Sequence, residues 1–129
     1  MKLTLRTMLI VAAIYWILNG LGGLLAPVSF WVKGDVAAPP FLVMALRFWG
    51  VASLALGVIA WLARNAEAST ARDAVVLGSI FWFALDAAVS LYGTTIDPAS
   101  PHVPFAVLEA LIGIGLFLAF RSSRANSSG

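Results

Sequence analysis

Four long apolar runs dominate the sequence and restrict what it can fold into. They are Met8–Ala26, Phe41–Leu62, Ala74–Tyr92 and Val103–Phe120, with lengths of 19, 22, 19 and 18 residues. Their charged residues are Arg47, Asp86 and Glu109. About 20 apolar residues in a helix cross the hydrocarbon of a bilayer, whereas a soluble bundle needs a polar face on each helix, which these runs lack. The sequence therefore predicts an all-α integral membrane protein, a bundle of four transmembrane helices.

The composition excludes the soluble alternatives. Of 129 residues, 61% are hydrophobic and 11% are charged, whereas soluble domains carry about 25% charged residues. A disordered chain would need low hydrophobicity and high net charge. The length fits one domain, which we expect to cover residues 1–121. We expect residues 122–129 to form a disordered tail or the remnant of an expression vector.

Capping signals set the expected limits of the helices, at about residues 8–26, 41–62, 71–92 and 101–120. Thr70 and Asp73 have the spacing of a capping box just before the third apolar run. Ser100 followed by Pro101 predicts an N-cap and a proline in the first turn of the fourth helix.

The distribution of basic residues predicts the orientation. The N-terminal segment, the middle loop and the C-terminal segment hold six of the eight Lys and Arg residues, whereas the first loop holds Lys33 and the third holds none. By the positive-inside rule, both termini and the middle loop are expected to be cytoplasmic. These scattered charges form no basic cluster that could grip a phosphate backbone, so we expect no nucleic-acid partner.

Each predicted helix carries one strongly polar side chain at a similar depth. Counted at 1.5 Å per residue from the expected outer ends, Asn19, Arg47, Asp86 and Glu109 lie about 9–10 Å below the outer boundary. Ionisable groups in a membrane are costly unless they face inward and pair. We therefore expect Arg47 to bridge to one or both carboxylates, because its guanidinium group is a forked donor.

Three interpretations of this polar layer stay open: a structural clamp for the bundle, a site that handles a ligand or a proton, and pairing with another subunit. Tyr15 and Trp82 lie one helical turn deeper and are read as packing residues or as an aromatic floor. His102 is read as a solvated loop residue. We expect no metal site, because the spacing of the acidic residues and His102 is not that of metal ligands, and the chain has no cysteine.

Several short motifs carry a family resemblance. The segment Leu21-Gly22-Gly23-Leu24-Leu25-Ala26-Pro27, followed by Leu46-Arg47-Phe48-Trp49-Gly50 and Leu56-Gly57, resembles the DoxX-like small four-helix membrane proteins. Glu109, early in the last helix, fits the same pattern, and the layout matches over residues 8–120. The resemblance implies a four-helix bundle in a bacterial inner membrane. Some members of this diverse family act as partners of oxidoreductases, but this sequence has no cofactor motif and we expect no cofactor.

Three functions are compatible with the sequence, and they leave open whether the protein is an enzyme. In the first, an outward-facing pocket binds a lipophilic ligand or a partner helix. The predicted ligand-binding residues are Tyr15, Asn19, Arg47, Trp49, Trp82, Asp86 and Glu109. In this reading Arg47 holds an anionic or carbonyl group, and the aromatic residues cover the apolar part.

The second function is a membrane enzyme of the isomerase or cyclase type, acting on a lipid or terpenoid with Asp86 and Glu109 as general acid and base. The third is a small proton-coupled transporter. The helices offer only Ser53 and Ser79 on the cytoplasmic side of the polar layer, which disfavours a path through the membrane. Beyond the bilayer, the expected partners are a lipophilic small molecule, and a second copy of the chain or another membrane protein.

Overall fold

The computed structural model describes residues 4–27, 39–96 and 102–125 of the chain. These residues form four helices: α1 (Leu5–Leu25), α3 (Pro40–Ala63), α4 (Thr70–Ile96) and α5 (His102–Ala125). All four helices are long and apolar enough to cross a membrane. The predicted all-α class with four transmembrane helices is confirmed.

The helices extend beyond their predicted limits, by three residues at the start of α1, four at the end of α4 and five at the end of α5. The N-cap of α4 is Ser69, whose Oγ accepts a hydrogen bond of 3.2 Å from the Arg72 backbone N–H, so the helix includes Thr70. Helix α5 continues to Ala125, five residues past its predicted end. Its last turn is held by Arg124, whose guanidinium nitrogen lies 3.5 Å from Asp73 at the start of α4. The predicted cap at Ser100 and Pro101 lies outside the described residues.

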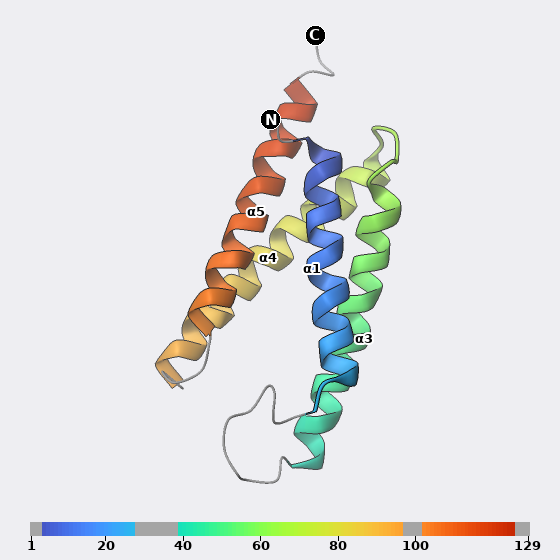
Figure 1. The fold of residues 1–129 in the computed structure, drawn as a ribbon. Coiled ribbons are helices and arrows are strands. Elements are labelled where there is room, and N and C mark those ends of the chain that lie inside the picture. Colours follow the sequence, from blue (N-terminus) through green and yellow to red (C-terminus); the bar gives the residue numbers. More distant parts are fainter. Residues whose placement is uncertain (1–3, 28–38, 97–101, 126–129) are drawn as a thin grey trace.

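The helices associate as two antiparallel pairs (Figure 1). Helix α1 packs along α3, and α4 packs along α5. Helix α4 begins beside the end of α3 and runs obliquely away from it, so α3 and α4 share little surface over most of their lengths. The antiparallel order brings the start of α1, the connection from α3 to α4 and the end of α5 to the same end of the bundle.

Glycines allow α1 and α3 to approach closely. A Cβ atom on Gly50 would lie 2.9 Å from the Gly20 carbonyl oxygen and 3.0 Å from the Gly23 carbonyl carbon. A Cβ atom on Gly57 would lie 2.7 Å from a side-chain carbon of Ile17. Small residues at such contacts let transmembrane helices gain dispersion energy from close backbone packing. The glycine-bearing faces of α1 and α3 therefore point toward each other.

The interior of the bundle is apolar and rich in large side chains. The largest fully buried ones are Leu9, Trp16, Val76, Phe83 and Leu116, together with the smaller Ser53. The Trp16 ring stacks on Phe83, with centroids 4.8 Å apart and an interplanar angle of 15°. Many other Leu, Val, Ile and Phe side chains point outward from all four helices. An apolar exterior of this kind is what a bilayer requires.

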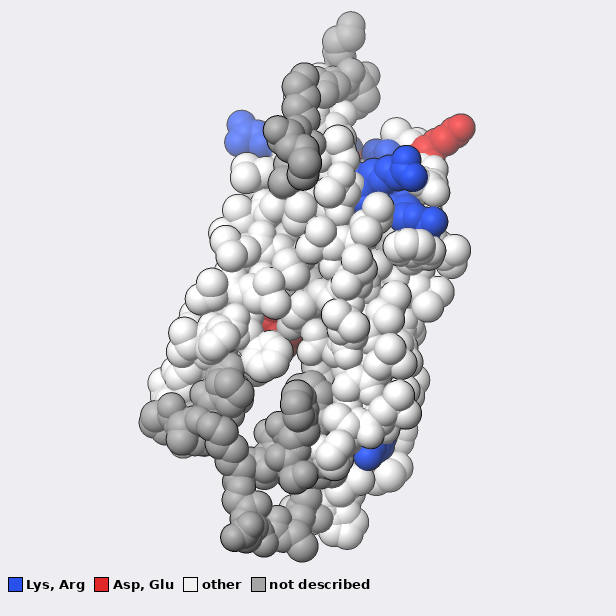
Figure 2. All heavy atoms as spheres, viewed as in Figure 1, with Lys and Arg blue, Asp and Glu red and all other residues white. Residues whose placement is uncertain are grey.

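Basic side chains gather at one end of the molecule (Figure 2). This end carries Arg64, whose guanidinium group lies 3.7 Å from the centroid of the Trp61 ring. It also carries Arg72 and Arg124, which both form ion pairs with Asp73, at 3.6 and 3.5 Å. Acidic atoms are also visible part-way along the molecule, recessed among apolar side chains (Figure 2).

Candidate functional site: a buried carboxyl cluster

Glu109 of α5 is the centre of a polar cluster inside the bundle. Its side chain is 3% exposed. The Tyr15 hydroxyl of α1 donates a hydrogen bond of 2.5 Å to Oε1, and the Ser90 hydroxyl of α4 donates one of 3.1 Å to Oε2. Both carboxyl oxygens thus have a partner, as buried polar atoms require. Three helices therefore converge on one carboxyl group.

Asp86 supplies the second carboxyl group of the cluster. It lies one turn before Ser90 on α4 and is half-buried. Its carboxyl group interacts directly with that of Glu109. Asp86 differs from Glu109 in its surroundings, because it also lines an open groove on the surface of α4. The pair thus extends from the core of the bundle to its surface.

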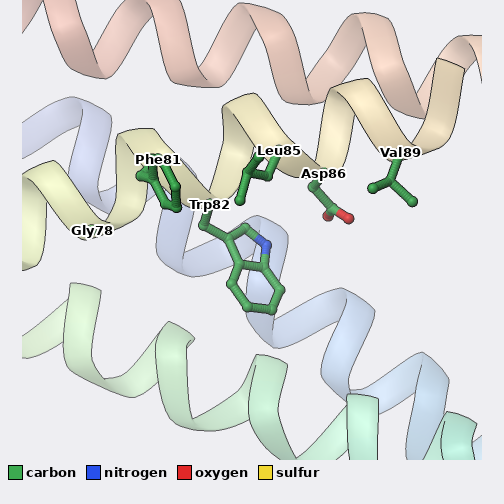
Figure 3. A pocket seen from close by; sticks show the side chains of 6 residues that line it. All are labelled: Gly78, Phe81, Trp82, Leu85, Asp86 and Val89. Atoms are coloured by element: carbon green, nitrogen blue, oxygen red, sulfur yellow. The ribbon is translucent and has the colours of Figure 1, made fainter. Parts of the chain in front are cut away.

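The groove beside Asp86 has a volume of about 270 Å³. The residues that line it come from successive turns of α4: Gly78, Phe81, Trp82, Leu85, Asp86 and Val89. Figure 3 shows the Trp82 ring reaching from α4 toward α1 and α3, with its nitrogen on the edge nearer the Asp86 carboxyl group. This Nε1 atom is buried, and the Asp86 carboxyl group, one turn farther along α4, interacts with it.

Arg47 does not form the ion pair with Asp86 or Glu109 that the sequence predicts. Its guanidinium Nη1 donates to backbone carbonyls at the end of α1. These are the carbonyls of Gly23, at 2.8 Å, of Ala26, at 3.3 Å, and of Leu24. Arg47 forms no ion pair with Asp86 or Glu109, because the ion pairs within the described residues are those of Asp73. The last carbonyls of a helix lack intrahelical partners and carry partial negative charge, so they compete well for an arginine.

The prediction of a single polar layer is wrong for Arg47. Glu109 meets Tyr15, whereas Arg47 meets α1 eight residues farther on, at Gly23, a separation of about 12 Å along a helix. Asn19 lies between these two levels, and its Nδ2 donates to the Tyr15 carbonyl at 2.9 Å. Depths counted from the ends of the apolar runs assumed one common outer plane, but α1 and α3 are offset along their axes.

The structure therefore divides the predicted site residues into two groups. Tyr15, Asp86 and Glu109 form the cluster, and Trp82 lines the groove next to it. Arg47 and Trp49 lie instead at the contact between α1 and α3. There the Trp49 ring would lie 3.1 Å from a Cβ atom on Gly23.

Two further features of the site were missed from sequence. Ser90 lies four residues after Asp86, so both are on one face of α4, but its hydrogen bond to Glu109 depends on how α4 and α5 pack. Phe83 is fully buried below the cluster, with its ring 5.4 Å from that of Tyr15 in an edge-on arrangement. Its spacing from the buried residues Val76, Ser79 and Ala87 would have indicated an inward position.

The four membrane-spanning helices and the internal carboxyl cluster define the class of protein: a multi-pass membrane protein with a polar site inside its helical bundle. No family model matches the chain, and neither a curated protein nor a solved structure gives a significant match. Among the described residues, no three His, Cys, Asp or Glu side chains are grouped closely enough to hold a metal ion. What the protein does must therefore be inferred from the chemistry of the cluster and the groove.

Proposed function

We propose that the protein binds a lipophilic ligand in an intramembrane pocket formed by the groove of α4 and the Asp86–Glu109 pair. One observation carries the proposal: a carboxyl pair that has no basic partner among the described residues adjoins an open, largely apolar groove. Ligand sites in membrane and soluble bundles combine apolar walls with a few convergent polar groups. Ionisable residues inside membranes are costly and mark functional sites by default.

Within the described part of the chain no basic side chain pairs with these two acids, which favours this function over a purely structural clamp. A clamp would pair each acid with a cation, because a buried charge without a partner destabilises a bundle. Arg47 is the membrane-embedded arginine, and it is engaged with α1 carbonyls instead. As packing residues alone, two adjacent acids would have no advantage over apolar side chains. Their place beside a groove is better explained by a ligand that reaches Asp86 from the groove.

The packing beneath the cluster supports binding over transport. A transporter needs polar access to its carrier residue from both sides of the membrane. Between Glu109 and the Arg-rich end of the bundle lie Leu9, Trp16, Phe83 and Leu116, which are fully buried apolar side chains. Toward that end the buried polar side chains among the described residues are Ser53 and Ser79, and neither is ionisable, which disfavours a path for protons.

An enzyme is the second candidate function, and the proximity of the two carboxyl groups favours it. Adjacent carboxyl groups can divide the roles of general acid and general base when their environments differ. Asp86 faces the groove, whereas both oxygens of Glu109 accept hydrogen bonds from the protein. In this reading Asp86 would exchange a proton with a lipid or terpenoid substrate, and Glu109 would take up or return that proton.

The membrane and the orientation belong to the same proposal. The Arg-rich end would face the cytoplasm by the positive-inside rule, so that both termini are cytoplasmic and the groove lies in the outer half of the bilayer. The resemblance to DoxX-like proteins points to a bacterial inner membrane. The exposed apolar surface could hold a second copy or another membrane protein as well as lipid.

Photo-labelling in lipid vesicles tests the proposed function. We would reconstitute the protein with hexadecyl diazirine probes bearing a hydroxyl, a carboxylate or a trimethylammonium head, and map the labelled residues by mass spectrometry. We expect at least one probe to label Phe81, Leu85 or Val89 in a manner that excess unlabelled competitor reduces more than fivefold.

A matched pair of variants shows whether the groove is the site. Leu85→Trp should fill the groove and abolish the competed labelling, whereas Leu111→Trp, at an exposed position of α5, should leave it unchanged. If the three probes label the groove but no unlabelled competitor reduces the labelling, the probes only contact the groove as bulk lipid does. That result would overturn the proposal.

A further inference from the structure

One acidic side chain lines a groove whose other walls are apolar or aromatic. Asp86 supplies this acid, and its carboxyl group interacts with that of Glu109 inside the bundle. The aromatic walls are Phe81 and Trp82, and the Trp82 indole interacts with the Asp86 carboxyl group. These three side chains lie on neighbouring turns of α4 (Figure 3). In the described part of the chain no basic side chain lines the groove, so an entering molecule meets one carboxyl group and two rings.

The two acids lack a counter-charge among the described residues. Arg47 donates to the end of α1, and the ion pairs of Arg72 and Arg124 are with Asp73 at the Arg-rich end. Two adjacent carboxyl groups can share a proton and then carry one negative charge between them. A charge in an apolar setting is costly unless an opposite charge lies beside it. A ligand with a single positive charge would supply that partner, whereas an anionic head group would be repelled.

The walls of the groove favour an organic cation over a metal ion. The face of an aromatic ring attracts a cation within about 6 Å, and proteins recognise quaternary ammonium groups with such rings. Leu85 and Val89 add apolar surface that suits alkyl substituents and a hydrocarbon tail. A hard metal ion would need several oxygen ligands. No three His, Cys, Asp or Glu side chains among the described residues are grouped to provide them.

We propose that the ligand of this groove is a lipophilic alkylammonium cation, whose charged head lies between the Asp86 carboxyl group and the rings of Phe81 and Trp82. This inference rests on the proposed function, because it names the chemical class that the same pocket takes. The ligand carries no anionic group next to its nitrogen. A zwitterionic phospholipid head is therefore excluded, because the acid pair would repel its phosphate group.

The shape of the groove is consistent with a ligand that arrives from the lipid. Phe81, Leu85 and Val89 line the groove and are also 67%, 52% and 65% exposed on the outside of the bundle. Gly78 adds open space, since nothing lies within 4 Å of a Cβ atom at this position. A volume of about 270 Å³ lies at the lower limit for ligand pockets. It would hold the head group and the first part of a tail, and the rest of the tail would stay in the bilayer.

Competition against the trimethylammonium diazirine probe tests the inference. The protein is reconstituted in vesicles of a neutral galactolipid, so that the bilayer itself contains no ammonium group. The unlabelled competitors share a saturated chain of matched length and differ in the head group. The four head groups are trimethylammonium, the uncharged tert-butyl group of the same shape, phosphocholine and carboxylate. We expect the trimethylammonium compound to compete about tenfold better than each of the others, because it alone combines a positive charge with no anionic group.

Three variants locate the recognition. Asp86→Asn removes the negative charge and keeps the shape of the side chain, so the trimethylammonium and tert-butyl compounds should compete within about twofold of each other. Phe81→Leu removes one ring and should lower the preference for the cation by about threefold. Glu67→Gln is the matched control, because it removes an exposed acid from the connection between α3 and α4, and it should leave the preference unchanged. Gel filtration and thermal unfolding in detergent show that each variant is folded.

The outcomes separate this inference from the proposed function. If the tert-butyl compound competes as well as the cation, the groove binds by apolar contact alone and the inference is overturned. The same holds if the phosphocholine or carboxylate compound competes best, or if folded Asp86→Asn keeps the full preference for the cation. If no competitor reduces labelling by the hydroxyl, carboxylate or trimethylammonium probe, the proposed function itself fails.

Discussion

Arg47 is a membrane-embedded cation whose partner is a helix end. The carbonyl groups in the last turn of α1 have no N–H partners within that helix, and the helix dipole makes them partly negative. Three of these carbonyls accept from one guanidinium nitrogen. The side chain thereby connects α3 to the end of α1 and does not pair with Asp86 or Glu109. These two acids interact instead with hydroxyl donors and with each other.

A double-mutant cycle distinguishes this arrangement from an ion pair. Arg47→Met should lower the free energy of unfolding by about 1–3 kcal/mol, because the α1 carbonyls lose a charged donor. Combined with Glu109→Gln, the effects should add within about 0.5 kcal/mol, since the two sites lie far apart and share no contact. Unfolding would be followed in detergent micelles. A coupling energy well above that limit would indicate that Arg47 and Glu109 interact after all.

At the scale of elements, the contact between α1 and α3 depends on glycine. Gly50 and Gly57 lie two turns apart on the face of α3 that meets α1, and both are buried. For α4, the spacing placed Trp82 and Asp86 on the inward face, whereas Phe83 is the fully buried residue of that turn. The predicted face was therefore rotated by about one residue, because spacing cannot fix which side of a uniformly apolar helix meets its neighbour.

Gly50→Ala should destabilise the pair α1–α3. The added Cβ would lie 2.9–3.0 Å from backbone atoms of Gly20, Gly23 and Leu24, and backbone cannot move aside as a side chain can. We expect a loss of about 1–3 kcal/mol in the free energy of unfolding, as for overpacked cores.

Gly78→Ala is the matched control, because nothing lies within 4 Å of a Cβ atom at this helical position. It should be neutral or stabilising by up to about 1 kcal/mol, since alanine favours a helix more than glycine does. Equal stability losses in the two variants would contradict close packing at Gly50.

At the scale of the whole molecule, the two helix pairs combine a closed end with a more open one. The Arg-rich end is held by the ion pair between Arg124 of α5 and Asp73 of α4, and the core next to it is filled with apolar side chains. Farther along, α4 leaves α3, and the carboxyl cluster and the groove lie in this part of the bundle. Access from the lipid follows from this asymmetry.

The orientation can be checked with single cysteines, because the chain has none. Glu67→Cys lies between α3 and α4, and Thr95→Cys lies near the end of α4; both positions are exposed. In intact bacterial cells, an impermeant maleimide should label Thr95→Cys directly and Glu67→Cys only after permeabilisation. The reverse pattern would place the Arg-rich end outside and contradict the positive-inside prediction.

The sequence alone determined the number and character of the helices, because the length of an apolar run relative to the bilayer is a local property. It also singled out the costly polar residues, since each is conspicuous within an apolar run. Only the tertiary structure decided their partners. Whether Glu109 meets Tyr15 or Arg47 depends on the axial offset and rotation of packed helices, which no single run encodes. The four residues expected in one layer lie at different levels. Asp86 and Glu109 form the carboxyl cluster, Arg47 caps the end of α1, and Asn19 lies between them on α1.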